Sequence, residues 1–425
     1  MNLLVVGGGG REHAIIKKLR ENKNIDTIYA LPGNGGIAAD AICVNEIGAK
    51  DIEKIVTFAK DHAIDFAVVA PDDPLALGCV DRLHEVGISC FGPDAKAARI
   101  EASKVFSKNL MKKYGIPTAS YEVFNDPVKA MEYLENASFP IVIKADGLAL
   151  GKGVLIPQNL TEAKYAVKSI MEDKAFGDSG NEIVIEEFLT GPEVSVLAFT
   201  DGTAIVPMVS SMDHKRAGDG DTGLNTGGMG TIAPNPYYTK ELADVCMETI
   251  FLPTLAAMRS EGCPFKGCLY FGLMMTPNGP KVIEYNCRFG DPETQVVLPL
   301  LKTDLLTVMQ AVENETLAEL NVEWHDRFAA CVILASGGYP ESYEKGKIMT
   351  IPELEASNVT IYHAGDKLDN GNLVTNGGRV LGVTATADSL KEALKDAYEA
   401  ADKVEFEGKY MRRDIGKRAL ECQEV

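Results

Sequence analysis

The sequence predicts a multidomain protein of mixed α/β and α+β class, and three observations lead to this fold class. The chain has 425 residues, more than one hydrophobic core usually supports. Its first hundred residues alternate short apolar runs with helical periodicity, which is typical of a parallel sheet covered by helices. The remainder contains strand-rich stretches and hairpins. We therefore predict an N-terminal parallel α/β domain, a mixed central region and a small C-terminal α+β domain.

Composition and charge exclude several classes of function. The chain is 46% apolar and 24% charged, as in an ordinary soluble globular protein. Its net charge of −19 argues against a nucleic-acid or anionic-membrane partner. The nine cysteines contain no Cys-x-x-Cys pair, which favours a reducing compartment over a disulfide framework or a zinc site. No signal peptide or membrane helix is evident, so we expect a cytoplasmic protein.

Residues 1–100 are predicted to form the N-terminal domain. The expected elements are strands at LLVV, TIYAL, FAVVA and ISCFG, with helices at Arg11 to Glu21, Ile52 to Asp61 and Leu77 to Val86. Function in a parallel sheet lies at the carboxyl ends of its strands. Those ends carry Gly7 to Gly10, Pro32 to Gly36 and Pro71 to Pro74. The three loops are therefore expected at one rim.

The first of these loops does not fit a dinucleotide site. Glu12 or His13 stands where a Gly-x-G-x-x-Gly fingerprint needs its third glycine, and the second strand ends without a carboxylate for a ribose. A glycine loop that opens a helix still suits a phosphate or another anion. The alternative is that the glycines serve only a tight turn.

A helical stretch from Pro93 to Tyr114 leaves this domain, and Gly115 to Pro117 should end it. We assign residues 101–117 as a linker helix to the next domain. Lys104 lies there among several lysines, and nothing in its local sequence distinguishes it from a lysine on a solvated helix face.

Residues 118–189 are predicted to form a compact unit of strands and helices around a glycine-rich turn. The turn, DGLALGKG, lacks the Walker A spacing, and a strand follows it instead of a helix. Glycines between two antiparallel strands could form a mobile flap over a polyphosphate, with Lys144 and Lys152 neutralising its charge. The alternative is a flexible hairpin with solvated lysines. The following IEEFLTGPE could present backbone to an adenine and Glu193 to a ribose.

Residues 190–326 are predicted to hold two strands, a long helix from Thr239 to Glu261 and a hairpin turning at Asn278 to Pro280. Between them, Ser210 to Thr231 reads as a long, nearly structureless polar loop. Such a loop is usually functional or disordered. Its mixture of charged, amide and hydroxyl side chains with glycines is suited to a small phosphorylated substrate, and surface disorder is the alternative.

The second strand of the hairpin runs into EYNCRFGDPE, where Glu284 and Asn286 share one face about 6.6 Å apart. Two protein oxygens, completed by water and phosphate, are how Mg²⁺ is usually held beside a nucleotide. An exposed polar strand end is the alternative.

Residues 327–425 are predicted to form the C-terminal α+β domain, with a strand at AACVILAS, a hairpin at Asp369 to Asn372, a strand at RVLGVTAT and a helix over Ser389 to Val404. Near its end, YMRRDIG could send Arg412 or Arg413 into a cleft, but a solvated basic turn is the favoured interpretation.

Taken in order, these motifs resemble those of the glycinamide ribonucleotide synthetases, a family of the ATP-grasp superfamily. The resemblance covers essentially the whole chain. It rests on VVGGGGREHA, PGNGG, DGLALGKGV, EEFLTGPEVSV, DHKRAGDGDTGLNTGGMG and EYNCRFGDPETQ. The fourth domain segment, 190–326, would then be the central ATP-grasp subdomain with the metal site, and 118–189 the ATP-grasp lid.

The resemblance implies ATP-dependent ligation of glycine to 5-phosphoribosylamine. The products would be glycinamide ribonucleotide, ADP and phosphate, formed through glycyl phosphate in the second step of de novo purine synthesis. The implied cofactors are ATP, as co-substrate, and Mg²⁺ or Mn²⁺. The implied partners are these small molecules only, with no nucleic acid and no membrane, for a monomer or weak homodimer.

The resemblance also implies roles for individual residues. Glu284 and Asn286 would bind the metal. Residues implied at the nucleotide are Lys104, Lys144, Gly147, Gly151, Lys152, Gly153, Glu186, Glu187, Leu189 and Glu193. Residues implied at the substrates are Gly8, Gly9, Gly10, Gly33, Asn34, Asp72, Asp213, Asn225, Thr226, Gly227 and Arg288. Catalytic roles are implied for Arg288, Asp291, Asp213 and Lys215.

One departure and two competing functions stay open. Asp72 stands where the family usually has Glu, so its reach is one methylene shorter and its role is in doubt. Another ATP-grasp ligase would share the flap and the metal strand but not the DHKRAGDGDTGLNTGGMG loop. A nucleotide-sensing or dinucleotide-binding module without chemistry is disfavoured by the failed fingerprint and by Glu284 with Asn286.

Overall fold

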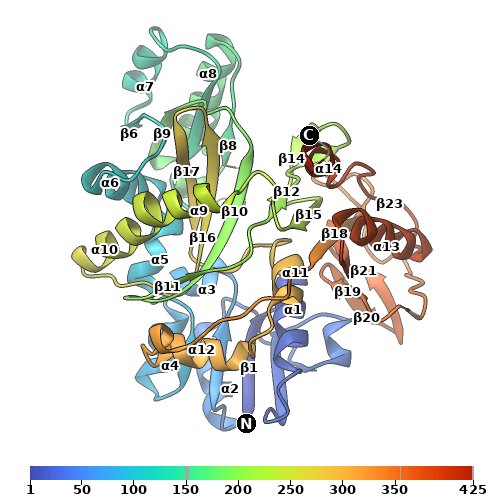
Figure 1. Ribbon diagram of the computed structural model, residues 1–425. Helices are drawn as coiled ribbons and strands as arrows, with labels where there is room; N and C mark the ends of the chain where they lie inside the picture. The colour runs from blue at the N-terminus through green and yellow to red at the C-terminus, as the bar shows by residue number, and fades with distance from the viewer. Residues whose placement is uncertain (149–152, 355, 424–425) are drawn as a thin grey trace.

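A computed structural model describes residues 1–148, 153–354 and 356–423 of the chain. The parallel sheet of the N-terminal part lies at the bottom of Figure 1, and long antiparallel strands rise from it through the centre. A smaller sheet with two helices stands at the top, and the C-terminal sheet lies to the right. The predicted combination of a parallel α/β domain with mixed α+β regions is confirmed.

The N-terminal sheet has the order β3-β2-β1-β4-β5, and all its pairs are parallel. The predicted helix over Leu77 to Val86 is α4, and the predicted loop before it contains a further short helix, α3. Gly78 separates the two helices with a left-handed conformation of φ +81°. The strands are β1 (Asn2–Gly7), β2 (Thr27–Pro32), β3 (Ile42–Cys43), β4 (Phe66–Val69) and β5 (Ser89–Phe91). The helices are α1 (Gly10–Leu19), α2 (Ile52–Asp61), α3 (Asp72–Ala76) and α4 (Cys79–Glu85).

The stretch predicted as one helix after this sheet is broken into α5 (Ala95–Ala102) and α6 (Lys104–Tyr114). Ser103 between them is extended, with φ −133° and ψ 112°, and its hydroxyl accepts the N–H of Phe106 at 3.0 Å. A serine in this conformation caps the helix that follows it. Gly115 ends α6 with φ +67°, where the sequence predicted the end.

Residues 118–189 contain the antiparallel sheet at the top of Figure 1, ordered β6-β9-β7-β8. Two helices cover this sheet and bury a separate apolar core with it. The elements are β6 (Tyr121–Phe124), α7 (Pro127–Leu134), β7 (Ile141–Ala145), β8 (Val154–Leu155), α8 (Leu160–Val167) and β9 (Ile183–Glu187).

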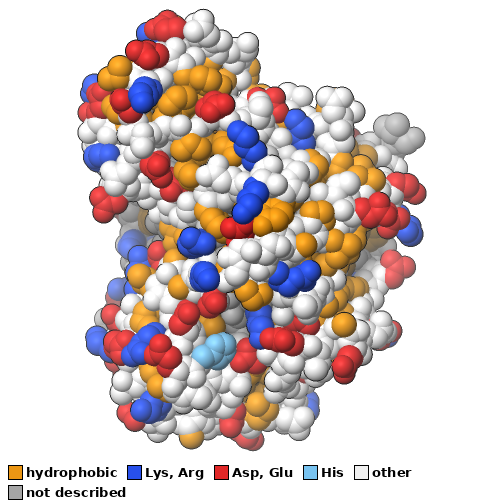
Figure 2. All heavy atoms as spheres, turned by 90° about the vertical axis from the view of Figure 1, so that its left-hand side faces the viewer, with side chains coloured by type: hydrophobic (Ala, Val, Ile, Leu, Met, Phe, Trp, Pro, Cys, Tyr) orange, Lys and Arg blue, Asp and Glu red, His pale blue; other side chains and the backbone are white. Residues whose placement is uncertain are grey.

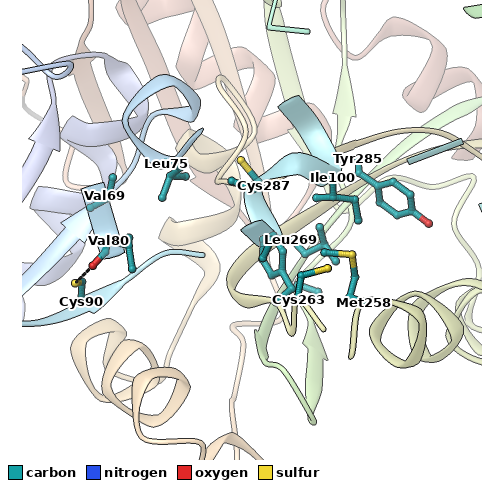
Figure 3. Packing of buried hydrophobic residues seen from close by; sticks show 14 of the residues in the cluster. Val69, Leu75, Val80, Cys90, Ile100, Met258, Cys263, Leu269, Tyr285 and Cys287 are labelled. Atoms are coloured by element: carbon teal, nitrogen blue, oxygen red, sulfur yellow. Dashed lines mark hydrogen bonds between the residues drawn. The ribbon is translucent and has the colours of Figure 1, made fainter. Parts of the chain in front are cut away.

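The central sheet is antiparallel and ordered β11-β10-β16-β17, with the predicted hairpin as β16 and β17. Its core is continuous with that of the N-terminal sheet. Figure 3 follows it from Val69 and Val80 past Ile100 of α5 to Leu269 and Tyr285. The elements are β10 (Glu193–Asp201), β11 (Ile205–Pro207), α9 (Lys240–Cys246), α10 (Leu252–Ser260), β16 (Lys266–Thr276) and β17 (Gly279–Asn286).

The polar segment from Ser210 to Thr231 is not structureless as predicted, because it contains four short strands. Two of them, β12 (Met212–Asp213) and β15 (Gly230–Ala233), join the C-terminal sheet, where β15 pairs with β18 (Phe328–Ser336). The other two form a small hairpin of β13 (Arg216–Gly218) and β14 (Thr222–Asn225). The partner strand lies about a hundred residues away, so the local sequence gives no sign of it.

The C-terminal sheet has the order β12-β15-β18-β22-β19, with β23 also on β18 and α13 packed across it. Two helices before it, α11 (Thr294–Val297) and α12 (Leu305–Glu313), were not predicted. The remaining elements are β19 (Val359–His363), β20 (Asp366–Asp369), β21 (Asn372–Thr375), β22 (Arg379–Ala387), α13 (Leu390–Lys403), β23 (Lys409–Tyr410) and α14 (Lys417–Gln423).

On the face in Figure 2, acidic and basic side chains are interspersed with apolar ones. None of the helices within the described ranges is both long and apolar enough to cross a membrane.

Candidate active site

The metal ligands predicted from the sequence lie at the end of β17. Glu284 stands opposite Gly272 of β16, next to a register shift, and a side chain at Gly272 would come within 2.9 Å of Glu284 Cγ. The glycine therefore leaves room for the carboxylate. The side-chain amide nitrogen of Asn286 donates to the carbonyl of Tyr285 at 2.9 Å, and no hydrogen bond from a described residue engages Asn286 Oδ1.

Burial by itself would raise the pKa of Glu284, but Lys215, Lys144 and Lys104 outweigh it and lower this pKa. The group is thus an anion at neutral pH. In the part of the chain that the structure describes, no three His, Cys, Asp or Glu side chains gather as a metal site. One carboxylate and one amide oxygen nevertheless fit a Mg²⁺ ion that keeps water and phosphate oxygens as its other ligands.

Three lysines from two predicted domains gather near this strand end. Lys144 and Lys108 both contact the buried carboxylate of Glu186, each at 2.9 Å, and Lys144 also donates to the carbonyl of Ile283 at 3.0 Å. Lys104 donates to the carbonyl of Gly147 at 2.7 Å. Burial lowers the pKa of Lys104, and it lowers that of Lys108 to about 8. Lys108 was not predicted; it resembled the other lysines of its helix.

The predicted flap is only partly described. Gly147 has φ +118°, and the carbonyl of Gly153 accepts the N–H of Ala145 at 2.9 Å. Gly151 and Lys152 lie outside the described residues. Lys104 thus contacts the base of the flap and not a solvated helix face.

Lys215 connects Glu193, which is predicted to lie at the ribose of the nucleotide, with the predicted metal ligand Glu284. Lys215 Nζ lies 3.1 Å from Glu193 and 3.9 Å from Glu284, and Glu193 chiefly raises its pKa well above the usual value. Glu187 is exposed, and its carboxylate is bound by Lys281 at 2.9 Å and by the N–H of Ser120 at 3.1 Å. Leu189 is partly exposed beyond the end of β9.

The glycine loop after β1 is closely packed. A side chain at Gly8 would meet the carbonyl oxygen of Gly33 at 2.2 Å. The N–H of Gly9 donates to Glu12 at 2.6 Å, so one of the free N–H groups expected for an anion is already satisfied. Gly10 begins α1 beside Gln295.

Asn34 is buried, and it links domains instead of pointing freely into a cleft. Its side-chain nitrogen donates to the carbonyl oxygens of Gly8 at 3.0 Å and His363 at 2.9 Å, while its oxygen accepts the N–H of Ile37 at 2.8 Å. Both polar atoms thus have protein partners. The contact of Asn34 with substrate stays a prediction.

The segment after β17 carries Arg288 and Asp291 toward the glycine loop. Asp291 accepts the N–H of Arg11 at 3.4 Å and the side-chain amide of Gln295 at 2.8 Å. Arg379 of β22 donates to the backbone oxygens of Asp291 at 2.7 Å and Gly227 at 2.8 Å. Arg379 was not predicted, because only the fold brings β22 to this segment.

Asp72 begins α3 and accepts the N–H of Asp73 at 3.0 Å. Burial lowers the pKa of Arg288, but the charge of Glu101 raises it and the charge of Asp72 adds to this rise. Asp72, from one of the three loops predicted at the edge of the N-terminal sheet, thus lies near Arg288.

The polar segment from Asp213 to Gly227 is fixed at both ends. Asp213 is bonded to the N–H of His214 at 2.7 Å, and burial together with Glu293 raises the pKa of Asp213. Thr226 donates to the carbonyl of Lys215 at 2.9 Å, and the N–H of Gly227 donates to Tyr339 at 3.1 Å. Asn225 is exposed on β14.

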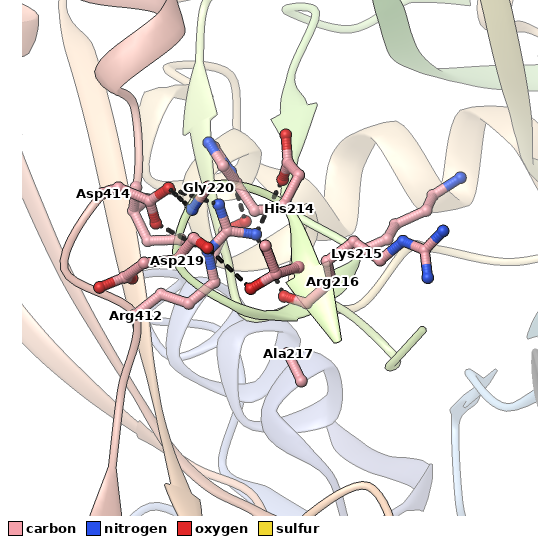
Figure 4. Close-up of polar contacts among 12 residues, drawn as sticks. His214, Lys215, Arg216, Ala217, Asp219, Gly220, Arg412 and Asp414 are labelled. Carbon is pink, nitrogen blue, oxygen red and sulfur yellow. Dashed lines mark hydrogen bonds and ion pairs between the residues drawn. The ribbon is translucent and has the colours of Figure 1, made fainter. Parts of the chain in front are cut away.

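Arg412 holds this segment from the C-terminal side (Figure 4). It is fully buried, with 2.8 Å contacts to both oxygens of Asp414, and it donates to Asp221 at 2.9 Å and to the carbonyl of Arg216 at 3.1 Å. The prediction of a solvated basic turn is therefore wrong for Arg412. It holds for Arg413, which is 56% exposed.

Three family models match consecutive parts of the chain. They are described as the phosphoribosylglycinamide synthetase N domain at residues 1–101, its ATP-grasp (A) domain at 102–294 and its C domain at 329–418. Together they cover most of the sequence.

Individual proteins give the same match. A phosphoribosylamine-glycine ligase of Caldanaerobacter subterraneus is 48% identical over 416 residues, 98% of this chain and 99% of the relative. A bifunctional purine biosynthetic protein of Pichia angusta is 49% identical over 99% of this chain, which spans only 54% of that longer relative. The crystal structure of a phosphoribosylamine-glycine ligase from Thermotoga maritima superposes with a TM-score of 0.86 at 37% identity, covering 98% of this chain and 100% of that one.

Proposed function

The chain belongs to the phosphoribosylglycinamide synthetase family, whose central domain has the ATP-grasp fold, and we propose that it is a phosphoribosylamine-glycine ligase. The reaction joins the carboxyl carbon of glycine to the amine of 5-phosphoribosylamine and converts ATP to ADP and phosphate. Relatives that carry this name match the chain over nearly their full length.

The observation that carries the proposal is the arrangement of one short segment, residues 284–291. At its start, Glu284 faces Lys215 beside Glu193, and Lys144 reaches the carbonyl of Ile283 immediately before it. At its end, Asp291 contacts the N-terminus of α1 in the glycine loop. A nucleotide on the first side and the substrates on the second would meet across this segment.

The chain's own residues then act mainly by charge and position. Lys104 and Lys144 neutralise the phosphates, the main chain after Glu186 lies along the adenine, and Glu193 lies at the ribose. Arg288 binds an oxyanion of a substrate, and Asp291 holds the glycine loop. Phosphoryl transfer needs in-line alignment and electrostatic stabilisation more than a covalent role for the protein.

The two oxygens at the end of β17 would hold Mg²⁺ or Mn²⁺, which would neutralise charge on the transferred phosphoryl group when bound. We further propose that glycyl phosphate forms first and that the amine opens it. The amine nitrogen then forms the new C–N bond while the C–O bond to phosphate breaks, and one proton leaves the nitrogen.

An assay of ADP release tests the function. Purified protein with ATP and Mg²⁺ is given glycine and 5-phosphoribosylamine, first singly and then together. We expect sustained ADP release only with both substrates. ADP release at the same rate with and without 5-phosphoribosylamine would refute the ligase function. Formation of AMP would refute the glycyl phosphate route.

We also propose a reducing, cytosolic setting, which the nine unpaired thiols support. A monomer or weak homodimer stays a prediction.

A further inference from the structure

Glu101, at the C-terminal end of α5, has a buried carboxylate that no motif of the sequence singled out. Its side chain is 7% exposed, and one oxygen contacts Arg288 Nη2 at 2.9 Å. The other oxygen accepts the backbone N–H of Cys287 at 2.7 Å. Glu101 therefore binds both the residue that follows Asn286 and the side chain of Arg288.

Both oxygens of Glu101 accept from nitrogen donors, and one donor is a guanidinium, as in a charge-assisted ion pair. Burial raises the pKa of Glu101, and the charge of Arg288 and the N–H of Cys287 oppose this rise. The other contacts of Arg288 are weak. Its Nη1 donates only to the carbonyl of Phe289 at 3.3 Å, and its Nε is buried without an acceptor among the described residues. The orientation of the guanidinium therefore depends chiefly on Glu101.

Glu101 also stands where three parts of the molecule meet. Its helix packs against α3, which begins with Asp72, and against β17. Figure 3 shows Ile100, the residue before it, beside Tyr285 in the shared core. Two and three residues later, Ser103 contacts Asp146 at 3.2 Å and Lys104 contacts Gly147 at 2.7 Å, at the base of the predicted flap. The carboxylate is thus anchored by rigid elements.

We propose that Glu101 is a positioning residue for the ligase reaction, which orients Arg288 toward a substrate oxyanion and fixes the peptide that follows Asn286. This inference rests on the proposed function. The oxyanion is either the carboxylate of glycine or the phosphate of 5-phosphoribosylamine. A guanidinium held in one orientation binds either group without losing rotational freedom at that moment.

The test compares Glu101→Gln and Glu101→Asp with the wild-type enzyme. Glutamine keeps an oxygen for Cys287 but removes the charge that holds Arg288. We expect kcat/KM to fall about 10- to 100-fold, mainly through a higher KM for one substrate, with KM for ATP nearly unchanged. A rise in KM for glycine identifies its carboxylate as the oxyanion, and a rise for 5-phosphoribosylamine identifies the phosphate. Glu101→Asp, which keeps the charge, should recover part of the loss.

Glu313 offers a matched control. It also accepts the N–H of a cysteine, Cys90 at 3.4 Å, and contacts a basic side chain, His84 at 2.8 Å, but it lies on α12 away from the site. Glu313→Gln should leave the kinetic constants within about twofold. A double variant of Glu101→Gln with Arg288→Lys should be little worse than Arg288→Lys alone, because the two residues act as one unit.

Two kinetic results would each overturn the proposal. One is a folded Glu101→Gln enzyme with wild-type kcat/KM, and the other is a double variant whose losses multiply. A lower melting temperature with unchanged kinetic constants would also assign Glu101 to stability alone.

Hydrogen exchange gives a readout that does not depend on turnover. The amide of Cys287 should exchange faster in Glu101→Ala and at the wild-type rate in Glu313→Ala. An inactive wild-type protein would refute the proposed function, and the exchange result would then decide the positioning role. Unchanged exchange at Cys287 would contradict it.

Discussion

At the scale of single residues, Glu284 is set apart by the lysines around it, which keep it charged although it is half-buried. We predict that Glu284→Gln lowers kcat/KM by on the order of 100-fold or more, since loss of even an outer partner of a metal site costs about 10- to 100-fold. The fold should persist, because Lys215 keeps Glu193 at 3.1 Å. Steady-state kinetics and thermal unfolding measure the two effects.

Asn278→Ala, in the exposed turn of the same hairpin, is the control and should behave as wild type. Near-wild-type turnover of Glu284→Gln at limiting Mg²⁺ would contradict the metal assignment.

His214 predicts a specific loss of stability in acid. Its Nε2 accepts the N–H of Gly416 at 3.1 Å, so Nδ1 carries the proton and donates to the carbonyl of Gly230 at 3.0 Å. Burial, helped by Arg412, lowers the pKa of His214 to about 4. The unfolded chain takes up this proton below about pH 6.5 and the folded chain only near pH 4, so stability is full above pH 6.5 and is lost as the pH falls between these values.

The complete loss amounts to about 3 kcal/mol, and urea unfolding at about pH 7.5 and about pH 5 should reveal part of it. His214→Gln should be less stable at neutral pH but should lose less on acidification. His325→Gln, at an exposed histidine, should keep the wild-type pH dependence. Parallel curves for wild type and His214→Gln would rule out His214 as the source.

Prediction from sequence works best for site residues whose functional partners lie close to them in the sequence. Glu284 and Asn286 share a strand, and the fold brings Lys215 and Glu193 to them. Glu101 and Arg379 could not be found in this way, because their partners lie about 190 and 90 residues away in sequence. Asn34 shows a second limit, since the sequence does not reveal that its side chain bonds to Gly8 and Ile37 within the protein.

At the scale of elements, the segment from Asp213 to Thr226 depends on a clamp from the other end of the chain. We predict that Arg412→Ala destabilises the protein by roughly 3–5 kcal/mol, because it leaves the partly buried Asp414 without its cation. The exposed Asp221 would keep Arg418 at 3.3 Å. Amide exchange over β13 and β14 should rise. The value of kcat/KM should fall as well, since the same segment contains Lys215.

Arg413→Ala is the matched control for the clamp. Arg413 is the next residue, but its side chain is 56% exposed and forms an ion pair with the exposed Asp402, so its loss should cost less than about 1 kcal/mol. Equal effects of the two substitutions would show that Arg412 does not hold the segment.

Local signals placed most helices and strands, but they missed breaks that a single side chain causes. Ser103 divides a stretch of continuous helical periodicity because its hydroxyl caps the second half. Gly78, in a left-handed conformation, separates α4 from the unpredicted helix α3. The strands β12 and β15 were missed for another reason, because their pairing exists only once β18 has folded beside them.

At the scale of the whole molecule, the C-terminal part is not an independent attachment. Strands β12 and β15 come from the central part of the chain but complete the sheet built on β18 and β22. Arg379 reaches back from β22 to Gly227 and Asp291. The candidate site therefore includes backbone that the C-terminal sheet holds in place.

We accordingly predict that a chain truncated after residue 326 does not fold as a soluble ligase. It would expose the edge of β15 and buried residues such as Ile232, and an unpaired apolar edge promotes aggregation. Solubility and the cooperativity of thermal unfolding measure this. Co-expression of residues 327–425 should recover soluble protein, because the missing partner of β15 is then supplied in trans. A truncated chain that is monomeric, unfolds in one sharp transition and binds ATP would show instead that the shared sheet is dispensable.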